Sequence, residues 1–211
     1  MRHEFSSAQG LNGCKGAYQI KVTITNRACR TVKDVIYRRV MDWDVNPHEV
    51  FSGNPDDDLV TLSTGGLQGA GFLDAASNNG FCNPNPSTSC SDRHEAGDPP
   101  YTFGPADIGA HFDLNIGELS SGHSKVFNIL YGYFPENPAG SGNSDGWARK
   151  CTNNGFRTGI FSIGQDANKE NAFLFAVSPK VGAGHKTFCD PSIPRNTVLI
   201  SSAGPRASVG N

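Results

Sequence analysis

The sequence predicts an all-β protein built as an antiparallel β-sandwich with long loops rich in Gly, Asn and Pro. Apolar and polar residues alternate over several stretches, which is the period of a half-buried strand. The 25 Gly and 13 Pro residues supply frequent turns. No stretch shows a sustained helical period, an internal repeat or a coiled coil, so we expect an Ig-like sandwich.

The clearest strand is YQIKVTIT, residues 18–25, whose apolar face carries Tyr18, Ile20, Val22 and Ile24. A longer strand is expected at VIYRRVMDWDV, residues 35–45, before Asn46 and Pro47. By its period, the side chains that pack inward are Tyr37, Met41 and Trp43, and those on the opposite face are Arg38, Asp42 and Asp44.

Two arginines in this longer strand leave alternatives open. Arg39 falls on the apolar face, so its guanidinium must reach an acidic partner, a backbone carbonyl or the sheet rim. A β-bulge would remove the conflict by shifting the register. Arg38, on the other face, can pair with acidic side chains at the surface or at a contact.

Residues 46–105 are expected to form a long, ordered, loop-rich excursion, with one strand at DLVTLST, residues 58–64. A loop of this length in a compact domain is expected to be functional, stapled or packed on a neighbour. A hairpin should follow, with strands at 112–116 and 127–133 joined by a turn at SSGH.

Two later strands, at 156–165 and 171–181, are expected to pair antiparallel, and a last apolar run lies at 197–202. At this length, one β-sandwich can account for the whole chain. We therefore expect a single domain over 1–211, with core strands at about 18–181 and a C-terminal extension at 182–211.

Charge and hydropathy exclude several classes of partner. The 18 basic and 20 acidic residues give a formal charge of −2, so no global field recruits nucleic acid or an anionic membrane. The apolar runs are shorter than the roughly 20 residues of a membrane helix. The N-terminal MRHEFSSAQG lacks the apolar core of a signal peptide, so the protein is either cytosolic or a processed or excised chain.

Six cysteines, with no C-x-x-C pair and no zinc-finger spacing, favour a disulfide framework in an oxidising compartment, and hence an extracellular or cell-surface location. Cys82 and Cys90 bracket NPNPSTS and are close enough for a local bridge. Cys151 and Cys189 extend beyond the same end of the two later strands, so we expect them to pair.

Cys14 and Cys29 flank one extended strand, which at about 3.3 Å per residue separates its own ends by more than about 20 Å. They are therefore the best candidates to be free, to reach elsewhere, or to cross-link to a neighbouring subunit. Simple elimination would instead pair them with each other, and the sequence leaves this conflict open.

Recognisable catalytic motifs are missing from the sequence. The six histidines lie mostly in polar or turn-like contexts, which predicts surface positions; they are His3, His48, His94, His111, His123 and His185. A Ser-His-Asp triad could be assembled from the many Ser and Asp residues, but triads are recognised by geometry, which a sequence does not supply.

Calcium is the one cofactor that the sequence suggests, with Asp42 and Asp44 as candidate ligands and Asp56, Asp57 and Asp58 as an acidic loop. The favoured alternative is that Asp42 and Asp44 pair with Arg38 or Arg39 or cap turns. Trp147, in the polar loop NSDGWARK, is a candidate contact for a sugar ring, although a loop tryptophan more often holds its loop to the sandwich.

The stretch YRRVMDWDV resembles a widespread family of secreted β-sandwich domains in bacterial surface and sorting-signal-bearing proteins. The resemblance continues through FGPADIGAHFDLNIGELSSGHSKVFNILYG, IFSIGQ and FLFAV, and covers about 18–181. Relatives tend to have Asp-His-Gly where this chain has Asp107-Ile108-Gly109, which argues against a histidine-dependent site there. The resemblance implies an extracellular, Ig-like, non-catalytic domain with no accepted active site.

We therefore expect a non-catalytic extracellular structural or adhesive module, with the subunit of a surface filament or sheath as its most specific form. Its partners would be further copies in a homo-oligomer or larger assembly, or glycans, with no nucleic acid and no membrane span. The alternative is a carbohydrate-binding module that uses Trp147 and neighbouring loops. A hydrolase with a loop-built site is the third hypothesis, and it requires a pocket that joins nucleophile, base and oxyanion donors.

Overall fold

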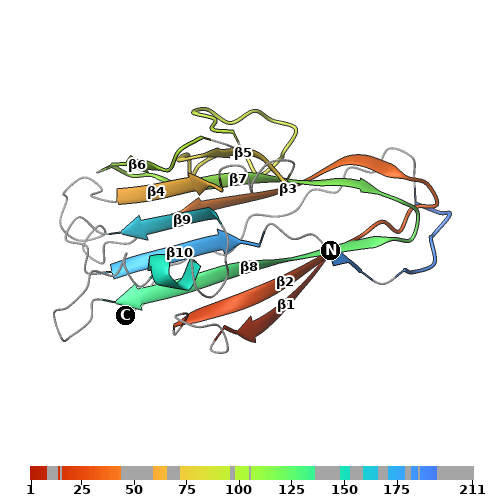
Figure 1. Ribbon diagram of the computed structural model, residues 1–211. Helices are drawn as coiled ribbons and strands as arrows, with labels where there is room; N and C mark the ends of the chain where they lie inside the picture. Colours follow the sequence, from red (N-terminus) through yellow and green to blue (C-terminus); the bar gives the residue numbers. More distant parts are fainter. Residues whose placement is uncertain are drawn as a thin grey trace.

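The computed structural model describes residues 1–8, 14, 16–43, 59–65, 72–95, 98–104, 106–135, 148–152, 159–165, 171–178, 182–184 and 186–193. Two antiparallel sheets pack face to face in these ranges, so the predicted all-β sandwich is confirmed (Figure 1). The strands are β1 (Arg2–Ser7), β2 (Ala17–Thr25), β3 (Val32–Asp42), β4 (Leu59–Thr64), β5 (Leu73–Ser77), β6 (Tyr101–Phe103), β7 (Gly109–Leu119), β8 (Ser124–Pro135), β9 (Ile160–Gln165), β10 (Asn171–Val177) and β11 (Gly182–Ala183).

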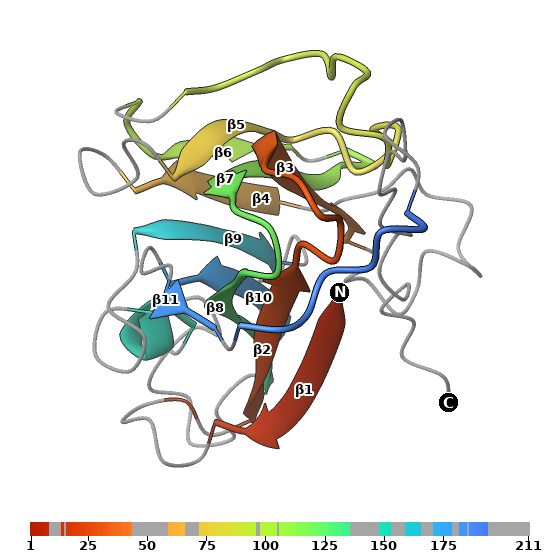
Figure 2. The ribbon, with the colours of Figure 1, turned by 90° about the vertical axis from the view of Figure 1, so that its right-hand side faces the viewer.

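The larger sheet runs in the order β1-β2-β8-β10-β9-β4-β6, and β11 also pairs with β8. The smaller sheet runs β3-β7-β5. Figure 2 shows the large sheet curling from β1 round to β4 and β6, which lie beside the small sheet. The small sheet therefore covers only part of the inner face of the large one, and the β1-β2 end projects beyond it (Figures 1 and 2).

The main core between the sheets is formed by the apolar side chains that alternate with polar ones along the strands. Along β2, Ile20, Val22 and Ile24 are buried as the sequence predicts. Tyr18, on the same face, is 42% exposed because it lies at the end of β2 away from the core cluster. Other strands of both sheets fill the same cluster with Tyr37, Met41, Trp43, Leu62, Phe112, Leu114, Phe127, Ile129, Phe175 and Val177, among others.

A second apolar cluster lies on the outer face of the large sheet. Leu130, Ile163 and Leu174 point to this side from β8, β9 and β10, opposite in period to the inner residues. A helical turn at residues 148–152 covers them, and Figure 1 shows it in front of β10 and β8. The central strands are thus buried on both faces, which explains their nearly continuous apolar sequences.

Part of the predicted strand pairing is confirmed and part is wrong. β9 and β10 pair antiparallel, as expected. The strands predicted as a hairpin, now β7 and β8, do not pair with each other: β7 lies between β3 and β5, and β8 lies between β2 and β10. The turn at SSGH therefore carries the chain from one sheet to the other. Alternation shows that a segment is a strand but does not identify its neighbour.

The loop-rich excursion at 46–105 also holds more regular structure than expected. Besides β4, which DLVTLST predicted, it contains β5 and the three-residue β6. β1 and β11 were not predicted either, because strands this short or this exposed carry little apolar alternation. The apolar run at 197–202 lies outside the described residues. Among the described residues, no helix is long and apolar enough to cross a membrane.

Candidate functional site

A buried ion pair joins the two longest strands of the small sheet. Arg38 of β3 and Asp113 of β7 are direct neighbours in the antiparallel register. Arg38 donates from Nε to Oδ1 and from Nη2 to Oδ2 of Asp113, each at 2.6 Å, which is the two-pronged geometry of the strongest Arg–carboxylate pairs. Both side chains are buried, so the expectation that Arg38 pairs at the surface is wrong.

The remaining donor of Arg38 holds a loop over this pair. Nη1 donates to the carbonyl oxygens of Asn83, Asn85 and Thr88, at 2.8, 2.9 and 2.9 Å. These residues belong to the segment 78–95, which we call the covering loop. The loop lies on the outer face of the small sheet, and the Cys82–Cys90 disulfide closes it on itself. Arg38 therefore compensates a carboxylate and donates to three loop carbonyls, of which that of Asn85 also accepts from the backbone N–H of Thr88.

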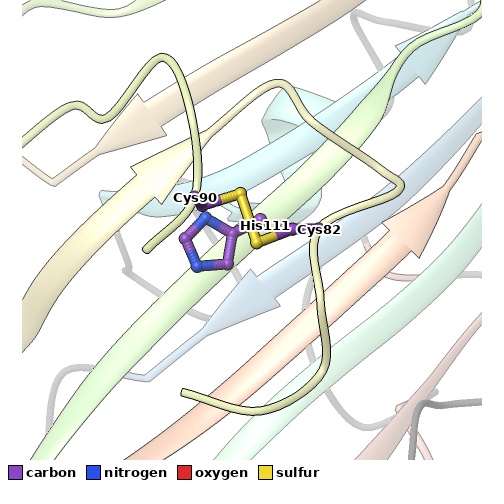
Figure 3. Close-up of side chains that lie close together, drawn as sticks. All are labelled: Cys82, Cys90 and His111. Atoms are coloured by element: carbon purple, nitrogen blue, oxygen red, sulfur yellow. A yellow bond between two sulfur atoms is a disulfide. The ribbon is translucent and has the colours of Figure 1, made fainter. Parts of the chain in front are cut away.

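His111 and Ser77 extend this network along the next row of the sheet. They are neighbours in the β5–β7 register, and Ser77 Oγ lies 3.2 Å from His111 Nδ1. On the other side of the ring, His111 Nε2 lies 3.2 Å from Asp113 Oδ1. Figure 3 shows the imidazole of His111 beside the Cys82–Cys90 bridge, and Ser77 Oγ is 3.5 Å from Cys90 Sγ.

Ser77, His111 and Asp113 thus stand in the order of a catalytic triad, but their surroundings do not suit catalysis. Ser77 and His111 are 0% exposed and Asp113 is 3% exposed. A nucleophile must be reached by substrate, and the carboxylate of this row is already held by two bonds from Arg38. The arrangement instead joins β3, β5 and β7 to the covering loop by polar contacts. The expectation that all histidines lie at the surface is wrong for His111.

Two cavities are lined by residues outside this row. One, of about 390 Å³, is lined by residues near the end of β2 and the start of β3, including Arg27, Val32 and Lys33. Another, of about 450 Å³, is lined by the β7–β8 turn and β11, including Leu119 and Gly184. Neither is lined by Ser77, His111 or Asp113, so neither joins this candidate nucleophile to a base.

The surroundings of Asp113 lower the pKa of its carboxyl group. Burial by itself raises the pKa of the carboxyl, but the hydrogen bonds from Arg38 and the close approach of His111 outweigh burial and hold the pKa below its ordinary value of 3.8. Because the folded-state pKa lies below the unfolded one, the ionised carboxylate stabilises the fold above pH 3.8. This stabilisation is lost as the pH falls through the folded-state pKa.

We expect the free energy of unfolding of the native protein to fall as the pH drops below 3.8, and the Asp113→Asn protein to show a smaller fall over the same range. Asparagine carries no titrating proton at this position, so its lower stability should vary less with pH. Urea unfolding at a series of pH values measures the two curves. Parallel curves would show that Asp113 does not contribute to acid sensitivity.

Cys82, Cys90 and His111 form the one group in the described residues that could bring three metal-ligating atoms together, all within 4.8 Å of one another. In the structure, the two sulfurs are joined as a disulfide. A metal binds thiolates, and a disulfide offers none, so the bridged form is a staple rather than a metal site.

The disulfide pattern confirms one predicted pair and corrects the others. Cys82 pairs with Cys90, as their spacing suggested. Cys14 pairs with Cys151, and Cys29 pairs with Cys189, so the predicted Cys151–Cys189 bridge is wrong. For Cys14 and Cys29, the alternative that each reaches elsewhere in the chain is confirmed, whereas their pairing with each other and their roles as free or intermolecular cysteines are wrong.

The wrong pairs have a structural reason. A Cys151–Cys189 bridge requires the chain to continue straight beyond the paired ends of β9 and β10. Instead, the segment before β9 folds back over the outer face of the large sheet, where Cys151 meets Cys14. After β10 the chain runs along β8 through β11 to the opposite end, where Asp190 forms a bridge with Ala28 and brings Cys189 to Cys29.

The remaining candidate residues are placed only in part. Asp42 lies at the end of β3, in no group of three metal-ligating side chains among the described residues. Asp44, Asp56 to Asp58 and Trp147 lie outside the described residues. The partners that the structure gives to the two arginines are Asp113 for Arg38 and Tyr131 for Arg39, so the expectation that Asp42 and Asp44 pair with them or cap turns stays a prediction.

Arg39 lies on the apolar face and bonds to a tyrosine, a partner that the sequence did not suggest. It is buried, and it donates to the phenol oxygen of Tyr131 from Nη2 at 2.7 Å and from Nε at 3.2 Å. The β3 bulge lies earlier, between Val32 and Ile36, so it does not rotate Arg39 away from the core. The inward positions of Tyr37, Met41 and Trp43 are confirmed, and Trp43 donates to Ser162 Oγ at 2.9 Å.

Sequence analysis missed the network of Ser77, His111 and Asp113. The available signal was HFDLNI in β7, where His111 and Asp113 alternate with strongly apolar residues and so share one face. The polar residues on this face are typical of a strand face that contacts water. The covering loop is rich in Asn and Ser, and such a polar sequence does not indicate that the loop packs on the sheet.

Comparison of the chain with protein-family models, with curated proteins and with solved structures found no match. The resemblance of YRRVMDWDV to secreted β-sandwich domains therefore stays a prediction. The fold and the disulfides are the findings from which a function can be argued.

Proposed function

We propose that this chain is a non-catalytic extracellular module with a structural or adhesive role. The observation that carries this proposal is the use of the buried polar residues. Arg38, Asp113, His111 and Ser77 hold a stapled loop onto a sheet, where a catalytic site would expose such residues to a cavity. In this chain the side chains that could act in catalysis instead stabilise the attachment of a loop to a sheet.

The disulfides add to this argument. Cys29–Cys189 ties the β2–β3 connection to the segment after β11, and Cys14–Cys151 ties the β1–β2 connection to the helical turn on the outer face. Both bridges join residues more than 130 positions apart, with separations of 160 and 137. Three disulfides fit an oxidising, extracellular setting. Because all six cysteines are bridged within the chain, contacts between copies would be non-covalent.

Two aromatic pairs are poor sites for a sugar ring, whereas Phe81 and Phe188, at 62% and 98%, are exposed. Tyr18 and Tyr131 lie on neighbouring strands with ring centroids 5.6 Å apart and planes 18° apart, so the rings cover each other's faces. Phe173 covers Trp43 in a similar way, at 6.1 Å and 15°. Sugar rings stack on free aromatic faces, and these faces are occupied by neighbouring rings.

A fluorophosphonate probe, which forms a covalent bond with activated serine nucleophiles, tests the non-catalytic proposal. We expect no adduct on Ser77 in the native protein, because its hydroxyl is buried under the covering loop. Mass spectrometry of the intact protein and its peptides gives the readout, with a known serine hydrolase as the positive control. Stoichiometric labelling of Ser77, absent from a Ser77→Ala protein, would overturn the proposal and assign a hydrolase.

A further inference from the structure

Strand β1 forms one edge of the large sheet. It pairs with β2 on one side, and no described element lies along its other side (Figures 1 and 2). Most of its residues are exposed. An edge strand offers a row of backbone donors and acceptors to any strand that can lie beside it.

Proteins usually protect such edges with lysine, proline, a bulge or a very short strand. The other edge of this sheet, β6, is three residues long and is protected in that way. β1 has six residues, contains no proline, carries charges of both signs in Arg2 and Glu4, and pairs with β2 in unbroken register from Arg2 to Ser7. β1 is therefore the edge of the large sheet that is open to pairing.

The sequence at this edge, Met1 to Phe5, is self-complementary about His3. If two copies of the strand lie antiparallel with His3 facing its counterpart, Arg2 of each copy faces Glu4 of the other. On the opposite face of the joined sheet, Phe5 of each copy faces Met1 of the other. Opposite charges directly across an antiparallel pair stabilise it, and apolar pairs do so as well.

The side chains at these positions are free to change partner. Arg2 and Glu4 form an exposed ion pair within the strand, at 3.1 Å, which contributes little in solvent. Lys21 also reaches Glu4, at 3.5 Å, and would remain beside it. Phe5 and Met1 are 68% and 57% exposed, so both lose apolar surface to water when a second strand covers them.

Other registers are less favourable. A pair centred on Glu4 would place the two Glu4 carboxylates opposite each other, and a pair centred on Arg2 would do the same for the guanidinium groups. Like charges directly across a pair destabilise it. Among the pairings centred on Arg2, His3 or Glu4, the charge pattern therefore favours the one centred on His3.

We propose that β1 pairs antiparallel with β1 of a second copy of this chain, in the register that places Arg2 opposite Glu4 of the partner. The two large sheets then become one continuous sheet across a two-fold axis. This inference rests on the proposed structural role, because it supplies the contact between copies. A six-residue strand buries a small interface, so the dimer should be weak, with a dissociation constant of about 10 µM or higher.

Charge reversal with complementation tests the proposal. Arg2→Glu places two acidic residues in the strand, and Glu4→Arg places two basic residues there. Each variant alone then faces its own like charges across the two-fold axis, so we expect at least a tenfold weaker dimer. An equimolar mixture should dimerise as the native protein does, because the two acidic residues of one variant face the two basic residues of the other.

Sedimentation velocity of the full 211-residue chain, with any purification tag at the C-terminus, measures the monomer–dimer equilibrium. Arg93→Glu and Asp74→Arg form the matched control, because that exposed ion pair, at 3.0 Å, lies away from β1. Both control variants should dimerise like the native protein. Both positions in β1 are partly or largely exposed, so the reversals should leave the thermal unfolding curve unchanged.

Three results would overturn the pairing. The native protein could remain monomeric at millimolar concentration, the single reversals could dimerise as well as the native protein, or their mixture could stay monomeric. The proposed function is tested separately. A monomeric protein whose Ser77 is not labelled would remove the β1 contact alone, whereas labelled Ser77 would remove the structural role whether or not a dimer forms.

Discussion

Replacing Arg38 by methionine is expected to lower the free energy of unfolding by about 3–5 kcal/mol, the largest effect of any single substitution considered for this protein. The substitution leaves Asp113 buried as a carboxylate without its two-pronged partner. It also removes the donor to three carbonyl oxygens of the covering loop. Urea unfolding followed by tryptophan fluorescence at neutral pH measures the change.

A control is the exposed pair of Arg93 and Asp74, in which one nitrogen of Arg93 reaches the carboxylate at 3.0 Å and the side chains are 45% and 41% exposed. Arg93→Met should cost less than about 1 kcal/mol, because water screens and replaces this pair. The double variant Arg38→Met/Asp113→Leu should regain part of the lost stability, since it leaves no unpaired buried charge. Equal costs for Arg38→Met and Arg93→Met would contradict the assignment of Arg38 as the anchor of the covering loop.

Removing the Cys29–Cys189 bridge is expected to cost about 4–5 kcal/mol, and removing Cys82–Cys90 about 2–3 kcal/mol. The difference follows from loop length, because a bridge restricts the unfolded chain more when it closes a longer loop. The sequence separations are 160 and 8 residues. The variants Cys29→Ala/Cys189→Ala and Cys82→Ala/Cys90→Ala, compared by urea unfolding, measure both values.

Cys29 is exposed and Cys189 is partly exposed, so truncating them leaves no cavity, whereas Cys82 is buried and its truncation adds a packing cost to the loss of the short bridge. The slope of the unfolding free energy against urea should rise when the long bridge is removed, because the unfolded chain then exposes more surface. If the short bridge proved the more costly to remove, chain entropy would not be the main contribution, and the contacts of the covering loop would be.

The sequence predicted where strands form better than it predicted which strands pair with each other. Alternation identified β2, β3, β9 and β10, because one side of each repeat faces an apolar core. It failed for the β7–β8 hairpin, since a turn of four residues can close a hairpin or cross between sheets with the same local pattern. Which of the two occurs depends on the whole packing of both sheets.

The candidate site was harder to predict for a similar reason. Arg38 and Asp113 are 75 positions apart in the chain, and nothing in the local sequence of either shows that a loop covers both. Cysteine pairing failed where it depended on the path of the chain between strands, as for Cys151, and succeeded where eight residues left little freedom, as for Cys82 and Cys90.

The order of strands in the large sheet also determines when this protein can fold. β2 pairs with β8, and β4 pairs with β9. Each of these early strands can therefore pair only after a strand about 100 residues later has been synthesised. Pairings between distant segments form slowly, because the chain must close large loops before any contact compensates the lost entropy. A nascent chain that ends before β8 therefore exposes the apolar side of β2 to water. Completion of β10 is the event that allows the sandwich to assemble, so protection of the unfinished chain from aggregation is part of making this protein.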